Sequence, residues 1–142
     1  MPMTRKDKIA LLRGVELFSD LGARALGVVA DAAVEVSHRA GQYIVRQGQV
    51  GTGFYVVASG HVRVVRSGRL LERLGPGGFF GELSVIDQAP RAAHVIAEEA
   101  TTCVALASWE FTRLLERHPK IALAVLRTVA RRLRATTDHT RH

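Results

Sequence analysis

The stretch from Gly75 to Ala93 has the residue types of an anion-binding site. Glycines surround Phe79 and Phe80 at its start, and glycine lets a backbone adopt positive φ and approach a ligand closely. Residues 82–87 are expected to form a short helix, whose N-terminus offers unpaired N–H groups and the positive end of the helix dipole. Arg91 adds a planar donor fork that suits phosphate oxygens. The stretch therefore predicts a cradle for a phosphate group.

A carboxylate in the same stretch indicates what else the ligand carries. Glu82 would repel a phosphate if it pointed at one, but a carboxylate is a strong acceptor for a sugar hydroxyl. A phosphate cradle and a hydroxyl acceptor together suggest a ligand with a phosphate and a ribose. The residues alone leave an alternative open, in which a hairpin excursion carries an ordinary surface pair of Glu82 and Arg91.

Catalytic and metal-binding patterns are not apparent. The six histidines have no metal-ligand spacing, and no metal site is expected. Ser84 does not lie in a nucleophile elbow, and no Gly-Lys-Ser/Thr phosphate loop occurs. We therefore expect a binding protein and not an enzyme.

The rest of the chain reads as helix, then strands, then helix. From residue 34 the hydrophobic period changes to two, and short β-rich runs alternate with glycine turns such as Ser67-Gly68 up to residue 107. Short strands at this spacing are typical of an antiparallel sandwich, barrel or jelly roll. We expect one domain, with N-terminal helices at about 1–33, the strands at 34–107 and two C-terminal helices at 108–137.

Helix signals are strongest at both ends. Thr4 with Asp7 resembles a capping box, and Asp20 is a good N-cap for a second helix. Ser108 is expected to cap the next helix, and Pro119 suits the first turn of the last one. Trp109 is expected to anchor the final helices on the strands.

Bulk properties limit the function classes. The chain has 142 residues, 47% of them hydrophobic, which is enough for one core without disulfides or metal. Cys103, the single cysteine, is expected in the core of a cytoplasmic protein. The charged N-terminus and short apolar runs predict neither export nor membrane insertion. The net charge of +7 is compatible with nucleic acid, but we interpret the densest arginine cluster, at 127–134, as a solvated helix face.

Longer runs resemble a known family. The run FGELSVIDQAPRAAHVIA, residues 80–97, is similar to the phosphate-binding cassette of cyclic-nucleotide-binding domains, as in catabolite activator proteins and regulatory subunits of cyclic AMP-dependent kinase. GQVGTGFYVVASGHVRV, residues 48–64, resembles the family's glycine-punctuated strand pair. Residues 108–134 resemble the helices that follow the sandwich in bacterial members. The resemblance implies a mainly β fold, an antiparallel double-stranded β-roll of jelly-roll type with helices at both ends.

It also implies roles for the cassette, residues 79–93. Arg91 would pair with the cyclic phosphate, helped by backbone N–H groups near Leu83, Ser84 and Ala92. Glu82 and the backbone of Gly81 would hold the ribose 2′-hydroxyl. The ligand-binding set thus expected lies within two short runs: Phe80, Gly81, Glu82, Leu83 and Ser84, then Pro90, Arg91, Ala92 and Ala93. Some kinase regulatory subunits support the cassette arginine by an acidic residue near the position of Ala58, so the support of Arg91 is left open.

The base is expected to be adenine. In relatives that favour cyclic GMP a hydroxyl-bearing residue often follows the cassette arginine, and Ala92 offers no side-chain hydrogen bond. Cyclic AMP is therefore favoured over cyclic GMP. In this family the C-terminal helix closes over the base, and Arg131, Arg132 and Leu133 are the candidates to cap it.

Three functions remain open. The leading hypothesis is a cyclic AMP sensor whose C-terminal helix is repositioned by the ligand. The second is the effector domain of a DNA-binding regulator, although DNA binding by this chain alone is not expected, since only a polar tail follows Arg134. The third is a nucleotide-independent scaffold that forms a homodimer through its apolar last helix.

Overall fold

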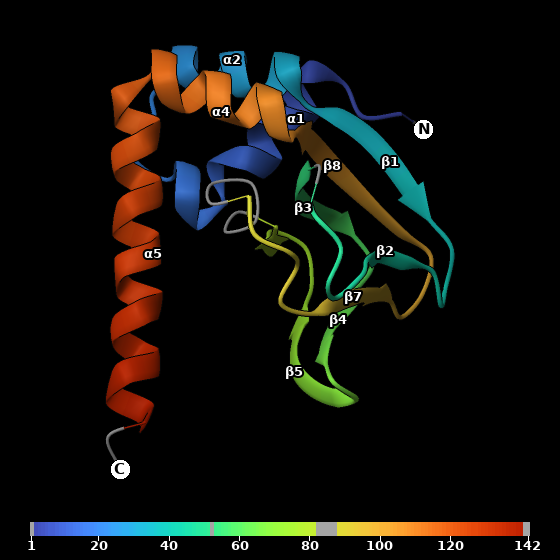
Figure 1. The fold of residues 1–142 in the computed structure, drawn as a ribbon. Coiled ribbons are helices and arrows are strands. Elements are labelled where there is room, and N and C mark those ends of the chain that lie inside the picture. The colour runs from blue at the N-terminus through green and yellow to red at the C-terminus, as the bar shows by residue number, and fades with distance from the viewer. Residues whose placement is uncertain (1, 52, 82–87, 141–142) are drawn as a thin grey trace.

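Two antiparallel four-stranded sheets form the body of the molecule (Figure 1). The structure is a computed structural model that describes residues 2–51, 53–81 and 88–140, with side chains up to residue 135. The first sheet has the order β1 (Val34–His38), β8 (Thr101–Ala107), β3 (Gly53–Ser59) and β6 (Phe79–Phe80). The second has the order β2 (Tyr43–Val45), β7 (His94–Ala97), β4 (Val62–Arg66) and β5 (Arg69–Leu74). The β-roll expected from the sequence is confirmed.

Helices from both ends of the chain gather at one end of the roll (Figure 1). The N-terminal part consists of α1 (Arg5–Arg13), a 3-10 turn η1 (Glu16–Phe18) and α2 (Ala23–Ala32). The C-terminal part consists of α4 (Ser108–Arg117) and the long α5 (Pro119–Thr140), which packs against η1. Thr4 and Asp7 form the expected reciprocal capping box at the start of α1.

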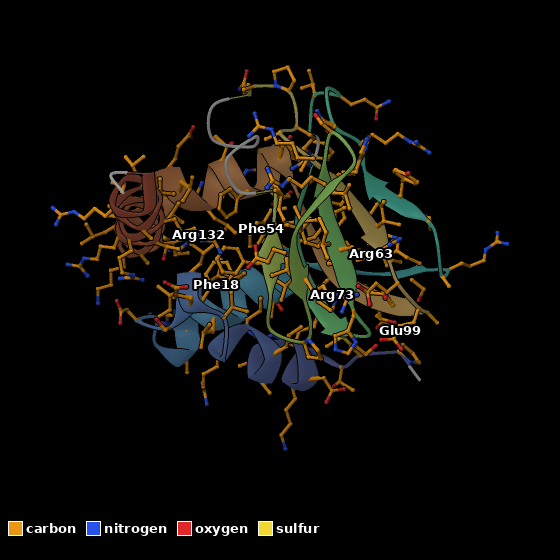
Figure 2. All side chains as sticks on the ribbon, turned by 90° about the horizontal axis from the view of Figure 1, so that it is seen from below. Phe18, Phe54, Arg63, Arg73, Glu99 and Arg132 are labelled. Carbon is orange, nitrogen blue, oxygen red and sulfur yellow. The ribbon has the colours of Figure 1, made fainter. Side chains whose placement is uncertain are left out.

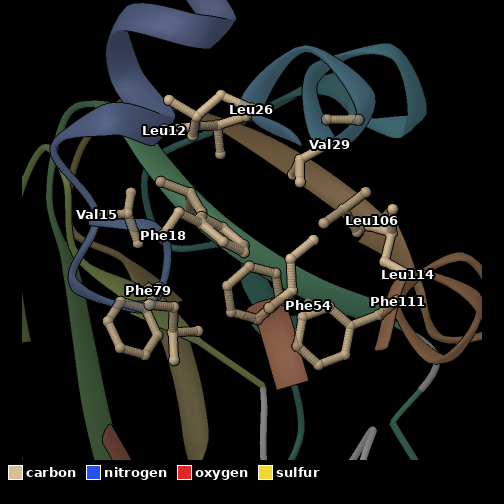
Figure 3. Close-up of a cluster of buried hydrophobic side chains, with 14 of the residues drawn as sticks. Leu12, Val15, Phe18, Leu26, Val29, Phe54, Phe79, Leu106, Phe111 and Leu114 are labelled. Carbon is tan, nitrogen blue, oxygen red and sulfur yellow. The ribbon is translucent and has the colours of Figure 1, made fainter. Parts of the chain in front are cut away.

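The larger core cluster lies between these helices and the first sheet. Phe54 is its centre, stacked on Phe111 at 5.0 Å between ring centroids and edge-on to Phe18 at 6.1 Å (Figure 3). Phe79 joins the same cluster, whereas its neighbour Phe80 joins a second cluster inside the roll, because successive side chains of a strand point to opposite faces. The two phenylalanines thus tie the glycine-rich stretch to both cores.

Cys103 belongs to the cluster inside the roll. It is fully buried, as expected, and burial raises the pKa of its thiol to about 12. The thiol is therefore protonated and packs as a small apolar group.

Three local predictions are wrong. The N-cap of α2 is Gly22, because a turn after η1 takes up Asp20, which instead forms an ion pair with Arg127. Ser108 is the first residue of α4 rather than its cap, which is Ala107. Trp109 is 64% exposed, because Phe111 and Leu114 occupy the buried face of α4. None of the helices in the described part of the chain is both long and apolar enough to cross a membrane.

Candidate functional site

Arg91 is a buried arginine at the wall of a pocket in the roll. It is 6% exposed, and its Nη2 donates a hydrogen bond of 2.6 Å to the carbonyl oxygen of Gly53. Its backbone is paired as well, since its N–H donates to Gln49 and its carbonyl accepts from Gly48. The loop before β3 therefore fixes the backbone of Arg91, and the first residue of β3 fixes its guanidinium.

Two glycines leave room for that guanidinium. A Cβ added to Gly51 would overlap the Arg91 guanidinium, and one added to Gly81 would lie 2.6 Å from Nη1. Gly81 also has a φ of +94°, which disfavours other residues. The carbonyl of Gly53 is thus the acceptor that supports the Arg91 guanidinium, the question that the sequence left open.

The pocket beside Arg91 has a volume of about 190 Å³ and a mixed lining. Its apolar wall comes from strands β2, β4, β5, β6 and β7 and from the cassette. Its charged groups are Arg91, Glu72 and Arg132. The apolar lining residues in the described part are Val45, Val64, Leu74, Phe79, Phe80, Ala92, Ala93 and Val95. One cation set at the edge of an apolar pocket can bind an anionic group attached to a flat apolar one.

Phe80 is held in this wall by a ring contact. The Phe80 ring stacks on Tyr55 of β3 with centroids 5.0 Å apart and an interplanar angle of 9°. Tyr55 and Phe80 are also direct partners in the antiparallel pairing of β3 with β6. This part of the pocket is therefore rigidly attached to the sheet.

Helix α5 contributes one side chain to the pocket. The guanidinium carbon of Arg132 lies 4.3 Å from the centre of the Phe79 ring, a cation–π contact. Figure 2 shows Arg132 pointing from α5 toward the roll. Of the three candidate capping residues, the structure brings only Arg132 to the pocket.

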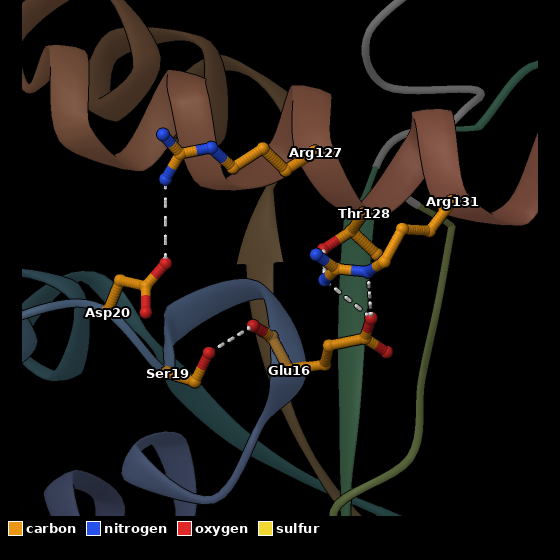
Figure 4. Close-up of polar contacts among 6 residues, drawn as sticks. All are labelled: Glu16, Ser19, Asp20, Arg127, Thr128 and Arg131. Atoms are coloured by element: carbon orange, nitrogen blue, oxygen red, sulfur yellow. Dashed lines mark hydrogen bonds and ion pairs between the residues drawn. The ribbon is translucent and has the colours of Figure 1, made fainter.

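The other two candidates lie elsewhere. Arg131 donates to Glu16 Oε1 from Nε at 3.2 Å and from Nη2 at 2.7 Å, while Arg127 pairs with Asp20 at 3.8 Å (Figure 4). Leu133 is 65% exposed and does not line the pocket. The arginine cluster is thus more than a solvated face, because Arg127 and Arg131 attach α5 to the chain around η1.

The remaining predicted residues divide into two groups. Ala92 and Ala93 line the pocket, and Pro90 forms an isolated bridge with Val50. Glu82, Leu83 and Ser84 lie outside the described residues. Sequence reasoning missed Gly51 and Gly53 as supports of Arg91, although the spacing of glycines before β3 was the available signal.

Across residues 2–51, 53–81 and 88–140, no group of three or more His, Cys, Asp or Glu side chains is placed to hold a metal ion.

Comparison with known proteins agrees with this geometry. The family model described as "Cyclic nucleotide-binding domain" matches residues 35–118, more than half of the chain. This chain belongs to the cyclic nucleotide-binding domain family. The crystal structure of Thermus thermophilus catabolite activator protein superposes with a TM-score of 0.82 at 34% identity, covering 88% of this chain and 61% of the other.

A kinase regulatory subunit and a kinase are also similar to this chain. The cAMP-dependent protein kinase regulatory subunit of Mucor circinelloides f. lusitanicus is 37% identical over 108 residues, 73% of this chain and 25% of the relative. A cGMP-dependent protein kinase of Toxoplasma gondii is 34% identical over 104 residues, 73% of this chain and 10% of the relative. The chain therefore spans less than two thirds of each of these relatives.

Proposed function

We propose that this domain binds cyclic AMP and acts as a regulatory sensor rather than as an enzyme. The observation that carries the proposal is the buried guanidinium of Arg91, fixed by Gly53 at the wall of an apolar pocket. A cyclic phosphate would pair with it, and a flat base would occupy the apolar part. The relatives named for cyclic AMP support this ligand class.

The remaining cassette residues complete the proposed site. Backbone N–H groups near Leu83, Ser84 and Ala92 would bind the phosphate, and Glu82 with Gly81 would bind the ribose hydroxyl. Phe80 and Ala93 line the pocket, and Pro90, which bridges to Val50, would hold the cassette beside it. Ala92 offers guanine no hydrogen bond, which supports cyclic AMP over cyclic GMP.

Arg132 is the proposed base cap. Its guanidinium already covers Phe79 from α5, and guanidinium planes stack on nucleobases. A ligand that enters between the roll and Arg132 would therefore change how α5 is held. Because Arg127 and Arg131 attach the same helix to Asp20 and Glu16, ligand binding would be transmitted along α5.

Thermal unfolding with cyclic AMP, cyclic GMP and 5′-AMP tests the proposal. A ligand at one hundred times its Kd stabilises by about 2.7 kcal/mol, which should raise Tm by about 5–15 °C for a domain of this size. Arg91→Ala should abolish the shift, while Arg24→Ala, which removes an exposed arginine from α2, should keep it. A wild-type domain that unfolds cooperatively without any shift would refute nucleotide binding. A shift of equal size in Arg91→Ala would refute the site.

A homodimer through α5 is a second part of the proposal. Leu123, Leu126 and Leu133 are each at least 47% exposed on α5, and with Ala130 they repeat at the spacing of a heptad seam. Light scattering should give a dimer that Leu126→Glu dissociates, while Arg134→Glu on the same helix leaves it intact. A monomer at high protein concentration would contradict this part alone.

The free, buried Cys103 supports a reducing, cytoplasmic setting for the domain. DNA binding and membrane insertion are not part of the proposal.

A further inference from the structure

The hairpin formed by β4 and β5 places arginine opposite arginine twice. In the strand register Arg63 pairs with Arg73, and Arg66 pairs with Arg69. Side chains directly opposite each other in an antiparallel pair have Cβ atoms about 5 Å apart, and like charges there are destabilising. Figure 2 shows Arg63 and Arg73 on this hairpin.

Little negative charge offsets these four arginines. Arg73 pairs with Glu98 through Nε at 2.8 Å. Arg63, Arg66 and Arg69 have no carboxylate within ion-pair distance in the part of the chain that the structure describes. Glu72, the acidic residue of β5, lines the pocket instead. Residues 62–74 therefore carry four arginines against the single carboxylate of Glu72.

The hairpin also has an open edge. Among the described strands, β5 pairs only with β4, so its other side is unpaired. Leu70 and Leu71 are 50% and 53% exposed on this edge strand. Its turn is fixed to the body, because the Ser67 N–H donates to Gln47 Oε1 at 2.9 Å. The hairpin extends away from α1, α2 and α4 (Figure 1).

An unpaired edge strand can receive an extended segment through main-chain hydrogen bonds. We propose that β5 is a docking edge for an acidic, extended segment of a partner polypeptide. Acidic side chains of that segment would neutralise Arg63, Arg66 and Arg69, and its apolar side chains would cover Leu70 and Leu71. The Arg63–Arg73 pair faces away from the pocket, because successive side chains of a strand point to opposite faces and the neighbouring Val64 and Glu72 line the pocket.

Charge selects this occupant over two others. A second copy that paired through β5 would place more arginines against these, which repel each other, so the arginines protect the edge from self-association. A nucleic acid would contact the arginines but would use neither the main-chain groups nor the two leucines. An acidic peptide strand uses the arginines, the main-chain groups of the edge and the two leucines.

The test measures the binding of three labelled peptides to the 142-residue chain by fluorescence anisotropy at low salt. The first alternates Glu and Val, the second alternates Lys and Val, and the third is the Glu–Val peptide with alternate backbone nitrogens methylated. We expect only the first to bind well, because the second has the wrong charge and the third cannot complete a strand pairing. Unfolding curves of every variant verify that it is folded.

Two variants with the same charge change localise the binding. Arg63→Gln/Arg66→Gln/Arg69→Gln should weaken the binding of the Glu–Val peptide on the order of tenfold. Lys6→Gln/Arg13→Gln/Arg24→Gln, on exposed positions of the N-terminal helices, should weaken it much less. Equal losses in the two variants would overturn the proposal, as would no binding of any peptide or unchanged binding of the methylated one. Binding of a single-stranded DNA oligonucleotide that depends on the hairpin, without binding of the Glu–Val peptide, would replace it by a nucleic-acid surface.

Discussion

Arg132 reaches from α5 to lie 4.3 Å from the centre of the Phe79 ring, which belongs to the glycine-rich strand β6. This contact joins the C-terminal helix to the pocket wall, 53 positions earlier in the chain. In the proposed sensor, a ligand in the pocket would change the surroundings of this side chain of α5.

Removing the Arg132 guanidinium should weaken cyclic AMP binding. Cation–π contacts contribute about 0.5–2 kcal/mol, so Arg132→Ala should raise the Kd by about 2- to 30-fold in a titration. Arg131→Ala, which breaks the Glu16 ion pair on the same helix, is the matched control and should have a smaller effect. If Arg131→Ala and Leu133→Ala weaken binding as much as Arg132→Ala, Arg132 is not the cap.

Adding one methyl group at Gly51 should displace Arg91. The new Cβ would occupy the position of the guanidinium, so the hydrogen bond to Gly53 and the phosphate contact would both be lost. Gly51→Ala should raise the Kd for cyclic AMP by at least about tenfold, and the loss of this buried hydrogen bond should also lower Tm without ligand by several degrees. Gly22→Ala, where a Cβ meets no atom within 4 Å, is the control. An unchanged Kd in Gly51→Ala would show that Arg91 does not need this position.

The thiol of Cys103 should be unreactive in the folded domain. Burial raises its pKa to about 12, against about 8.5 for a free cysteine, so the thiolate is scarce at neutral pH. Ellman's reagent should react only as fast as the roll opens, and at once in denaturant. Rapid reaction of the native protein would contradict the burial.

The same shift makes stability depend on alkaline pH. Since the pKa is raised in the folded state, the stabilisation is complete below the unfolded pKa and is lost as the pH rises from about 8.5 toward 12. Urea unfolding of the wild type and of Cys103→Ala should show a steeper alkaline loss for the wild type. If the unfolding free energies of the wild type and of Cys103→Ala fall in parallel as the pH rises, the Cys103 thiol is not the cause of the alkaline loss.

His38 should make the fold sensitive to acid. It is buried at the end of β1, and among the described residues neither ring nitrogen has a hydrogen-bond partner, so desolvation lowers its pKa. The unfolded chain then binds the proton more readily, and stability is lost as the pH falls through about 6.5. His38→Leu should reduce the slope of the unfolding free energy between pH 8 and 5. An unchanged slope would assign the acid sensitivity to carboxylates instead.

The period of two between glycine turns by itself predicted an antiparallel sandwich, barrel or jelly roll, because these signals act over short stretches of backbone. The resemblance of residues 80–97 to a known family narrowed this prediction to the β-roll that the structure shows. The capping box at Thr4 and the start of the last helix at Pro119 are equally local, and both are confirmed. The N-cap prediction at Asp20 was wrong because the turn after η1 includes Asp20 and moves the start of α2 to Ala23.

Only the tertiary structure decided which distant groups meet. The support of Arg91 by Gly53 crosses 38 residues, and no pattern near either residue specifies it. Arg131, Arg132 and Leu133 are consecutive on one helix, so their different surroundings follow from the rotation of α5 against the roll. Trp109 is exposed for the same reason, because the packing of Phe111 on Phe54 fixes which face of α4 is buried. Such choices depend on how whole elements pack, which no short stretch of sequence determines.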